Sequence, residues 1–200
     1  MAERPEWNHG QMSILQTVPE HEATGIVAEL YADDVRDQGY VAGHTKALAL
    51  NPEAVIAWQG LISAIAGPMD KRRYELVTLA AARGARSKHC LLAHGRKTLR
   101  YIDEPQLTAI AADYRNAELT EAEVAMMGFA ERVSVDAAGM TDADSQRLRD
   151  HGFTDREIVD IALAAAARNF YSRAVQALAV DVDELPGLSD SLRDALVHGL

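Results

Sequence analysis

The sequence predicts an all-α protein, folded as a single-domain bundle of about eight or nine helices. Apolar residues recur at helical spacing along most of the chain, and no convincing run alternates between apolar and polar residues as a half-buried strand would. Alanine, leucine, glutamate and arginine are abundant, and short polar breaks separate the periodic segments. Both features are typical of helices joined by short loops.

Capping patterns indicate where several helices begin. Asn51 and Asp70 each precede a periodic segment and carry the short oxygen-bearing side chain that satisfies exposed N–H groups. Thr120–Glu123 and Thr154–Glu157 have the spacing of a capping box. The predicted helices cover residues 23–38, 51–67, 70–84, 87–100, 103–116 and 158–180, with a further helix starting after 120.

Residues 1–18 contain few periodic apolar positions and are predicted to form an extended arm. The remaining residues, 19–200, have the size of one ordinary domain. No apolar run reaches the length of a signal peptide or a membrane span, so we expect a cytoplasmic protein.

Charge and cysteine content exclude several classes of partner and site. The chain has 20 Lys and Arg against 30 Asp and Glu, a net charge of −10, which repels phosphate backbones and anionic lipid. We therefore expect neither nucleic acid nor membrane as a partner. A single cysteine cannot form an intramolecular disulfide framework or a zinc site with several thiolates.

Two segments of the chain echo each other, with similar Ala-rich runs after Glu75 and Glu157. Polar residues follow at the same offsets in each: Ser87, Cys90 and His94 after Glu75, and Asn169, Ser172 and Gln176 after Glu157. The echo suggests a degenerate internal repeat in which one copy kept reactive groups. Ala-rich helices also resemble one another through composition alone, and both interpretations stay open.

The reactive groups gather in residues 75–94. At about 100° per residue, Ser87, Cys90 and His94 share one narrow stripe of a helix. Cys90 and His94 are one turn apart, close enough for the imidazole to accept the thiol proton. A helix that begins near Ser87 places Cys90 in its first turn, where the helix dipole favours the nucleophilic thiolate.

Glu75 lies on the preceding helix and can fold back after Gly84 to orient His94, which completes a nucleophile–base–orienter set. A structural interpretation stands beside this one, because a lone cysteine in such a helix is usually a small buried hydrophobe. A metal site is not predicted, because His89 points away from Cys90 and His94 on a helix.

The run Glu75-x₁₁-Ser87-x-His89-Cys90-x₃-His94 resembles the Glu-x₁₁-Cys-x-x-Cys-x₃-His signature of the alkylhydroperoxidase D / carboxymuconolactone decarboxylase superfamily. Segments 44–52, 69–82 and 162–170, together with Trp58, resemble its peroxidase-related branch. The resemblance spans roughly residues 18–198. It implies an all-helical, AhpD-like fold and a homo-oligomer.

The resemblance also implies roles for individual residues. In peroxidase members the second cysteine of the motif attacks a small hydroperoxide, and the first resolves the sulfenic acid as a disulfide. Cys90 then holds the attacking position, His94 and Glu75 form the proton relay, and His89 is the neighbouring histidine. Nothing in the sequence suggests a nucleotide, flavin, haem or other cofactor.

The sequence departs from this pattern at Ser87, which occupies the position of the resolving cysteine. A hydroxyl cannot form a disulfide, so an external thiol reductant or Cys90 of another subunit must reduce an oxidised Cys90. Ser87 could instead donate a hydrogen bond to the thiolate or the peroxide. The resulting expectation is a one-cysteine peroxidase.

Two other functions remain open at this stage. One is an acid–base lyase, in which Glu75 and His94 move a proton while Arg83 or Arg86 holds a substrate carboxylate. The other is a non-catalytic oligomeric scaffold, in which the motif residues serve only to pack the core.

Several residues outside the motif carry weaker predictions. Aromatic side chains on apolar faces are expected in the core: Trp58, Tyr74, Phe129 and Phe170. Tyr171 and Asn169 could line the same cavity as the motif. Arg168 is expected to form a structural ion pair with a carboxylate such as Glu75 or Asp160.

Overall fold

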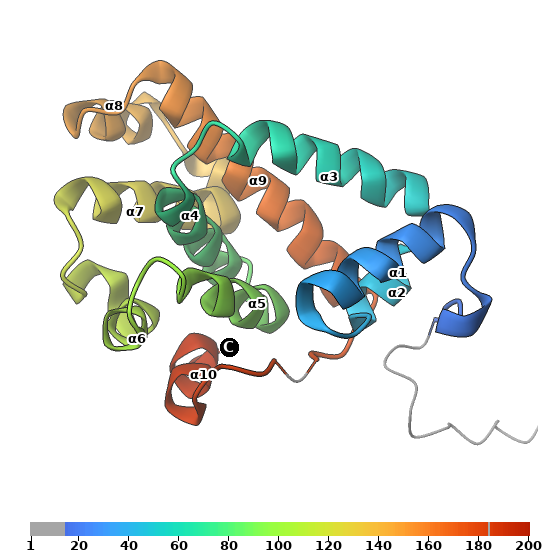
Figure 1. The fold of residues 1–200 in the computed structure, drawn as a ribbon. Helices are drawn as coiled ribbons and strands as arrows, with labels where there is room; N and C mark the ends of the chain where they lie inside the picture. The colour runs from blue at the N-terminus through green and yellow to red at the C-terminus, as the bar shows by residue number, and fades with distance from the viewer. Residues whose placement is uncertain (1–14, 184) are drawn as a thin grey trace, which may run out of the picture. The chain divides into compact units, whose positions relative to one another are not determined.

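The computed structural model describes residues 15–183 and 185–200, so most of the predicted arm lies outside the described residues. The described chain is all-α, with ten α-helices, three short 3₁₀ turns and no strand (Figure 1). The α-helices are α1 (Gly25–Gln38), α2 (Gly43–Leu48), α3 (Pro52–Ala66), α4 (Lys71–Gly84), α5 (Lys88–Thr98), α6 (Glu104–Asp113), α7 (Glu121–Asp136), α8 (Asp142–Asp150), α9 (Asp155–Ala177) and α10 (Asp190–Val197). The predicted all-α class is confirmed.

The chain divides into two compact units. Unit 1 contains residues 15–57 and 175–183, and its buried cluster is formed by Leu30, Tyr31, Val41 and Ala49. Its C-terminal segment is held by Asp183, whose carboxylate accepts hydrogen bonds from the Gly43 N–H at 3.1 and 3.2 Å.

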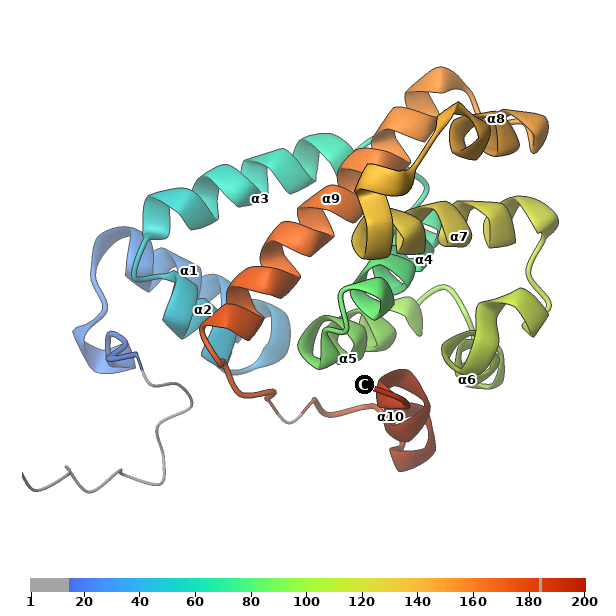
Figure 2. The same ribbon diagram turned by 180° about the vertical axis from the view of Figure 1, so that it is seen from behind.

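Unit 2 contains residues 58–174 and 185–200 and holds the larger core. Its helix α4 packs against α7 and α5, and α10 packs against α5 and α6 (Figures 1 and 2). Every residue of α4 from Tyr74 to Ala82 is buried, so this helix has no solvent-facing side along that stretch. A polar residue in this part of the sequence is therefore forced into the interior.

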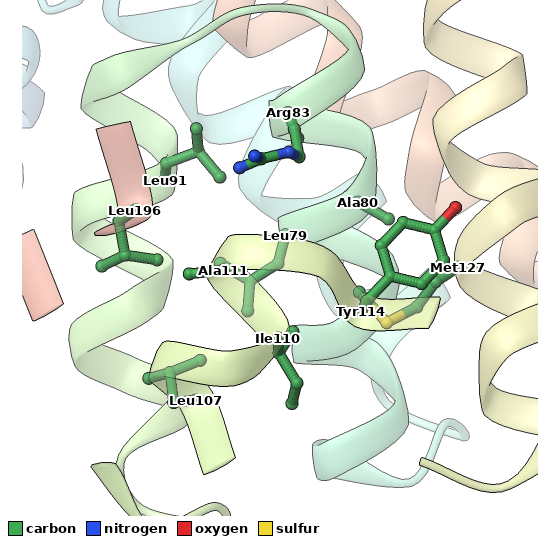
Figure 3. A pocket seen from close by; sticks show the side chains of 10 residues that line it. All are labelled: Leu79, Ala80, Arg83, Leu91, Leu107, Ile110, Ala111, Tyr114, Met127 and Leu196. Atoms are coloured by element: carbon green, nitrogen blue, oxygen red, sulfur yellow. The ribbon is translucent and has the colours of Figure 1, made fainter. Parts of the chain in front are cut away.

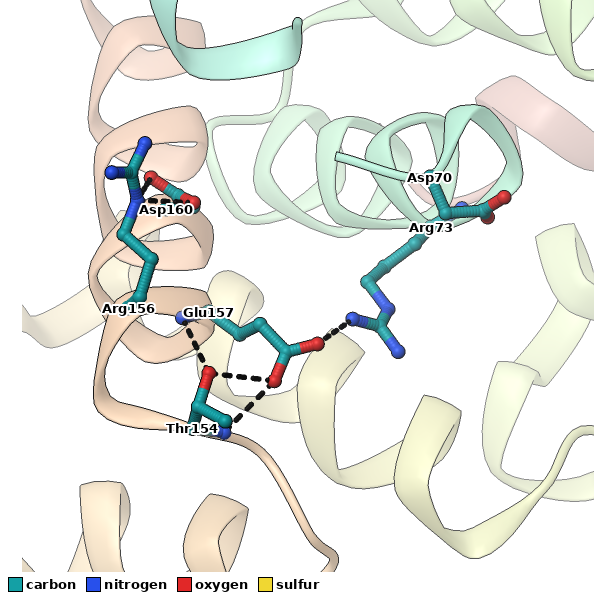
Figure 4. Close-up of polar contacts among 6 residues, drawn as sticks. All are labelled: Asp70, Arg73, Thr154, Arg156, Glu157 and Asp160. Carbon is teal, nitrogen blue, oxygen red and sulfur yellow. Dashed lines mark hydrogen bonds and ion pairs between the residues drawn. The ribbon is translucent and has the colours of Figure 1, made fainter. Parts of the chain in front are cut away.

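Side-chain caps fix the starts of several helices as the sequence predicts. The Asp70 carboxylate accepts a hydrogen bond from the Arg73 N–H at 2.9 Å, and Thr120 with Glu123 forms a capping box. At the start of α9, Glu157 accepts from the Thr154 N–H at 2.9 Å and donates its own N–H to the Thr154 hydroxyl (Figure 4). Glu157 also pairs with Arg73 at 2.5 Å (Figure 4).

Two details of the fold differ from the prediction. Helices α2, α8 and α10 were not located, because six to nine residues hold too few apolar positions to define a period. The echoed segments also fold differently: residues 75–94 form two helices separated by a turn, whereas residues 157–176 lie in the continuous helix α9. The echo is therefore not a repeated two-helix unit.

Of the four aromatic residues predicted to lie in the core, Phe170 is misplaced. Its side chain is 61% exposed on α9, while Tyr74 is buried and Phe129 packs against the core of unit 2. Phe170 follows Leu163 by seven residues on an outward face, and a helical period cannot by itself distinguish such a face from the core.

Within residues 15–183 and 185–200, no helix combines the length and the apolar character that crossing a bilayer requires.

Gly84 permits the close approach of α4 and α7. A Cβ atom at this position would lie 2.7 Å from the Ser134 Cβ and 2.8 Å from the Glu131 carbonyl oxygen. Gly60 in α3 offers a contrast, because a Cβ there would meet nothing within 4 Å.

We predict that Gly84→Ala lowers the free energy of unfolding by about 1–3 kcal/mol, because the added methyl must push the two helices apart. The matched change Gly60→Ala raises it by about 0.5–1 kcal/mol through helix propensity. Urea or thermal unfolding of the two variants measures both effects. Equal stability of the two variants would contradict the packing argument.

Candidate functional site

A tight turn between α4 and α5 brings the motif together. Helix α4 ends at Gly84, and Arg86 has a left-handed backbone with φ of 55°. The Ser87 N–H donates to the Ala82 carbonyl at 3.0 Å, which closes the turn. The chain reverses here, so α5 packs against α4 and their side chains can meet.

Ser87 is the N-cap of α5, and Cys90 lies in the first turn of that helix as predicted. The Ser87 hydroxyl oxygen accepts a hydrogen bond from the Cys90 backbone N–H at 3.4 Å. Its role in the structure is therefore to cap the helix, and this differs from the expected bond to the reacting sulfur. The Cys90 side chain is buried, with 1% of the residue exposed.

Glu75 and His94 form a buried hydrogen bond between α4 and α5. The His94 Nδ1 lies 2.7 Å from the Glu75 Oε2, and both side chains are buried. The Thr98 hydroxyl donates to the His94 carbonyl at 2.7 Å one turn further along α5. The structure thus brings together the pair that the spacing of the motif predicts.

Burial controls the ionisation of this pair. Desolvation raises the pKa of Glu75 to about 7, against the opposing effect of the cations Lys97, Arg168 and Arg100. Desolvation holds the pKa of His94 well below its usual value, and Arg168, Lys97 and His89 act in the same direction. At neutral pH His94 is therefore uncharged, while Glu75 stands near the midpoint of its titration.

His89 precedes Cys90 and is buried on α5. Desolvation, together with the nearby charge of Arg168, lowers the pKa of His89 to about 4. A neutral imidazole here contributes a polar group without adding a second buried positive charge.

Helix α9 contributes two side chains that contact the sulfur. The Arg168 Nη1 lies 3.6 Å and the Ser172 Oγ lies 3.2 Å from the Cys90 Sγ. The predicted ion pair of Arg168 with a carboxylate is wrong, because Asp160 binds Arg156 at 2.8 Å and Glu75 binds His94. Figure 4 shows the Arg156–Asp160 pair.

Two aromatic rings flank the Arg168 guanidinium. Its central carbon lies 5.6 Å from the Tyr171 ring centroid and 6.0 Å from that of Trp58. These two rings pack on each other at 4.5 Å between centroids. Tyr171 thus adjoins the site as predicted, whereas the Asn169 amide nitrogen donates to the Ser134 hydroxyl at 2.7 Å.

The arginines considered for a lyase lie elsewhere in unit 2. Arg83 lines a small apolar pocket between α4, α5, α6, α7 and α10, whose walls include Leu107, Tyr114 and Leu196 (Figure 3). Arg86 donates to the Gly199 carbonyl at 3.3 Å. The cations that act on Glu75 are instead Lys97, Arg168 and Arg100.

Among the described residues, no three His, Cys, Asp or Glu side chains are placed to share a metal ion. The motif predicts Glu75, Cys90 and His94 but not the contacts of Arg168 and Ser172 with the sulfur. Two signals for them were present: the echo aligns Ser172 with Cys90, and Arg168 interrupts a run of alanines on a long apolar helix.

No family model and no curated protein matches the sequence. Solved structures do match it over nearly its full length. An uncharacterized peroxidase-related protein from Ralstonia eutropha JMP134, described as an alkylhydroperoxidase AhpD core, is 22% identical, with a TM-score of 0.78 over 93% of this chain and 97% of that one.

A second uncharacterized peroxidase-related protein, from Silicibacter sp. TM1040, is 25% identical and has a TM-score of 0.74 over 86% of this chain and 93% of that one. The debrominase Bmp8, solved in complex with 2,3,4-tribromopyrrole, is 17% identical with a TM-score of 0.73, covering 92% of this chain and 97% of its own. The chain therefore has the AhpD-like helical fold, and it holds Glu75, Cys90 and His94 of the motif within unit 2.

Proposed function

We propose that this protein reduces small hydroperoxides with Cys90 as its one redox-active thiol. The observation that carries the proposal is the surroundings of the Cys90 sulfur, which contacts the Arg168 guanidinium and the Ser172 hydroxyl. A cation and a hydroxyl are groups that stabilise a thiolate, the nucleophilic form of cysteine.

The first step is attack of the Cys90 thiolate on the outer oxygen of the hydroperoxide ROOH. The O–O bond breaks, the sulfur is oxidised to sulfenic acid, and the alcohol ROH leaves after taking one proton. The hydrogen-bonded pair of His94 and Glu75 supplies that proton, having removed it from the thiol beforehand.

The second step needs two equivalents of an external thiol, because Ser87 cannot resolve the sulfenic acid. The first thiol displaces water from the sulfenic acid and forms a mixed disulfide with Cys90. The second thiol attacks that disulfide, restores the Cys90 thiol and leaves as an external disulfide. The site residues in this cycle are Cys90, His94 and Glu75, with Ser87 and His89 as supporting groups.

The fold alone does not select this reaction, since a debrominase shares it. The residues favour thiol chemistry over an acid–base lyase. Arg83 and Arg86, the groups considered for holding a substrate carboxylate, make their contacts with an apolar pocket and with Gly199.

We also propose that the protein forms a homo-oligomer through the outward face of α9. Val159, Leu163 and Phe170 are exposed there at spacings of four and seven residues, within about 40° of one another around the helix. An apolar stripe of this kind is typical of a surface covered by another subunit. The expected cytoplasmic location stays a prediction.

We predict that Cys90→Ser abolishes thiol-dependent hydroperoxide consumption, because the nucleophile is lost. Ser87→Ala retains a measurable part of the rate, because the Ser87 hydroxyl caps α5 and takes no part in the chemical steps. Its loss lowers the free energy of unfolding by about 0.5–2 kcal/mol. The assay follows loss of cumene hydroperoxide in the presence of dithiothreitol. A Cys90→Ser protein that keeps full activity, with His94→Asn inactive, would overturn the proposal in favour of an acid–base enzyme.

We predict that the rate of peroxide consumption rises with pH through a midpoint of about 7, the pKa of Glu75. Below that pH the Glu75 carboxyl is already protonated and cannot take up the thiol proton through His94. Glu75→Gln removes this midpoint and lowers the rate at pH 8 by about 100-fold or more. Glu121→Gln, at an exposed position of α7, serves as the control and leaves the profile unchanged.

We predict that Leu163→Glu combined with Phe170→Glu lowers the oligomeric state, because two carboxylates on the α9 face cannot be buried between subunits. Sedimentation velocity measures the change. Val135→Glu on α7, where the side chain is 67% exposed, is the control that retains the wild-type mass. An unchanged mass in the double variant would place the interface elsewhere.

A further inference from the structure

Arg168 is a buried cation that forms no ion pair with a carboxylate among the described residues. The residue is 4% exposed, and among the described residues its one hydrogen-bonding partner is the Cys90 sulfur. Its Nε is buried and bonded to no described group. A guanidinium can donate five hydrogen bonds and stays protonated, so among the described residues this placement leaves Arg168 hydrogen-bonded to no anion whenever Cys90 is a thiol.

The groups around Arg168 identify where a compensating negative charge can reside. Charged or titratable neighbours come from three helices: Tyr74 and Glu75 on α4, His89, Cys90 and His94 on α5, and Tyr171 on α9. Both histidines are neutral at pH 7 because burial lowers their pKa values. Among these neighbours, Glu75 and Cys90 are the two acidic groups that can place a negative charge beside Arg168 by losing a proton.

Neutral contacts hold the guanidinium in place against the sulfur. The Tyr171 and Trp58 rings lie 5.6 and 6.0 Å from its central carbon, and the Ser172 hydroxyl approaches the same sulfur at 3.2 Å. Aromatic faces attract a cation without cancelling its charge, so the guanidinium remains available to a thiolate.

We propose that Arg168 is the counter-cation of the Cys90 thiolate. The buried site then holds one negative charge, which lies on Glu75 or on Cys90 according to where the proton passed by His94 resides. When the proton leaves the Cys90 sulfur and reaches Glu75 through His94, the total charge of the site stays constant. The transfer therefore needs no ion from solvent in a site that is almost fully buried. This inference rests on the proposed function and assigns to Arg168 the direct stabilisation of the nucleophile.

The test is a thiolate titration followed by absorbance at 240 nm, with the Cys90→Ser protein as the blank. Because the chain has one cysteine, the difference reports Cys90 alone. We expect Arg168→Met to move the midpoint of the titration upward by about one to three pH units. Arg168→Lys recovers part of the shift, and the control Arg173→Met, five residues further along α9, titrates as the wild type does.

An unchanged midpoint in a folded Arg168→Met protein would overturn the inference. A second comparison covers the case in which that variant does not fold. Cys90→Asp places a permanent anion beside Arg168, and Cys90→Asn is its neutral counterpart of the same shape. We expect Cys90→Asp to melt at the higher temperature at pH 8, whereas the reverse order would show that Arg168 does not compensate an anion at this position.

These measurements use no peroxide and no reductant, so their failure is distinguishable from failure of the proposed function. If Cys90→Ser keeps its peroxidase activity, the function is wrong whatever the titration shows. If the titration midpoint is the same in Arg168→Met as in the wild type while Cys90→Ser is inactive, the proposed function is supported and the proposed role of Arg168 is wrong.

Discussion

Burial of ionisable groups around α4 is the constraint on which the rest of the site depends. Helix α4 is enclosed by its neighbours from Tyr74 to Ala82, so Glu75 cannot reach solvent. A carboxyl group in that position must have a hydrogen-bonding partner, and His94 on α5 provides it at 2.7 Å. The same burial raises the pKa of Glu75 into the neutral range.

Small residues make this enclosure possible. Gly84 lets α7 approach the end of α4 closely, and the alanines at positions 80–82 are buried with it in the core of unit 2. The turn at residues 85–87 then directs α5 back along α4, with Arg86 in a left-handed conformation. Backbone geometry and side-chain chemistry are therefore coupled, because the turn that ends α4 also sets the position of Cys90 in the first turn of α5.

Ser87 and Ser172 show how the site differs from a two-cysteine arrangement. Ser87 caps α5 through the Cys90 backbone N–H, whereas Ser172 on α9 reaches the Cys90 sulfur. A hydroxyl contact and a guanidinium contact surround the sulfur with polar groups that cannot be oxidised to a disulfide. Under the proposed function, the oxidised Cys90 must therefore be reduced by a thiol from outside the chain.

The all-α class, the capping boxes at Thr120 and Thr154, and the grouping of Glu75, Cys90 and His94 can all be predicted from the sequence. These features follow from local rules, since helical spacing and cap chemistry act over a few residues, and a glutamate at the observed distance before a turn can fold back on the next helix. Three features are visible only in the folded chain: the contacts of Arg168 and Ser172 with the sulfur, the exposure of Phe170, and the folding of the echoed segment as one helix. The contacts with the sulfur depend on which face of α9 meets α5. That choice is made by packing between segments about 80 residues apart, which no local pattern records.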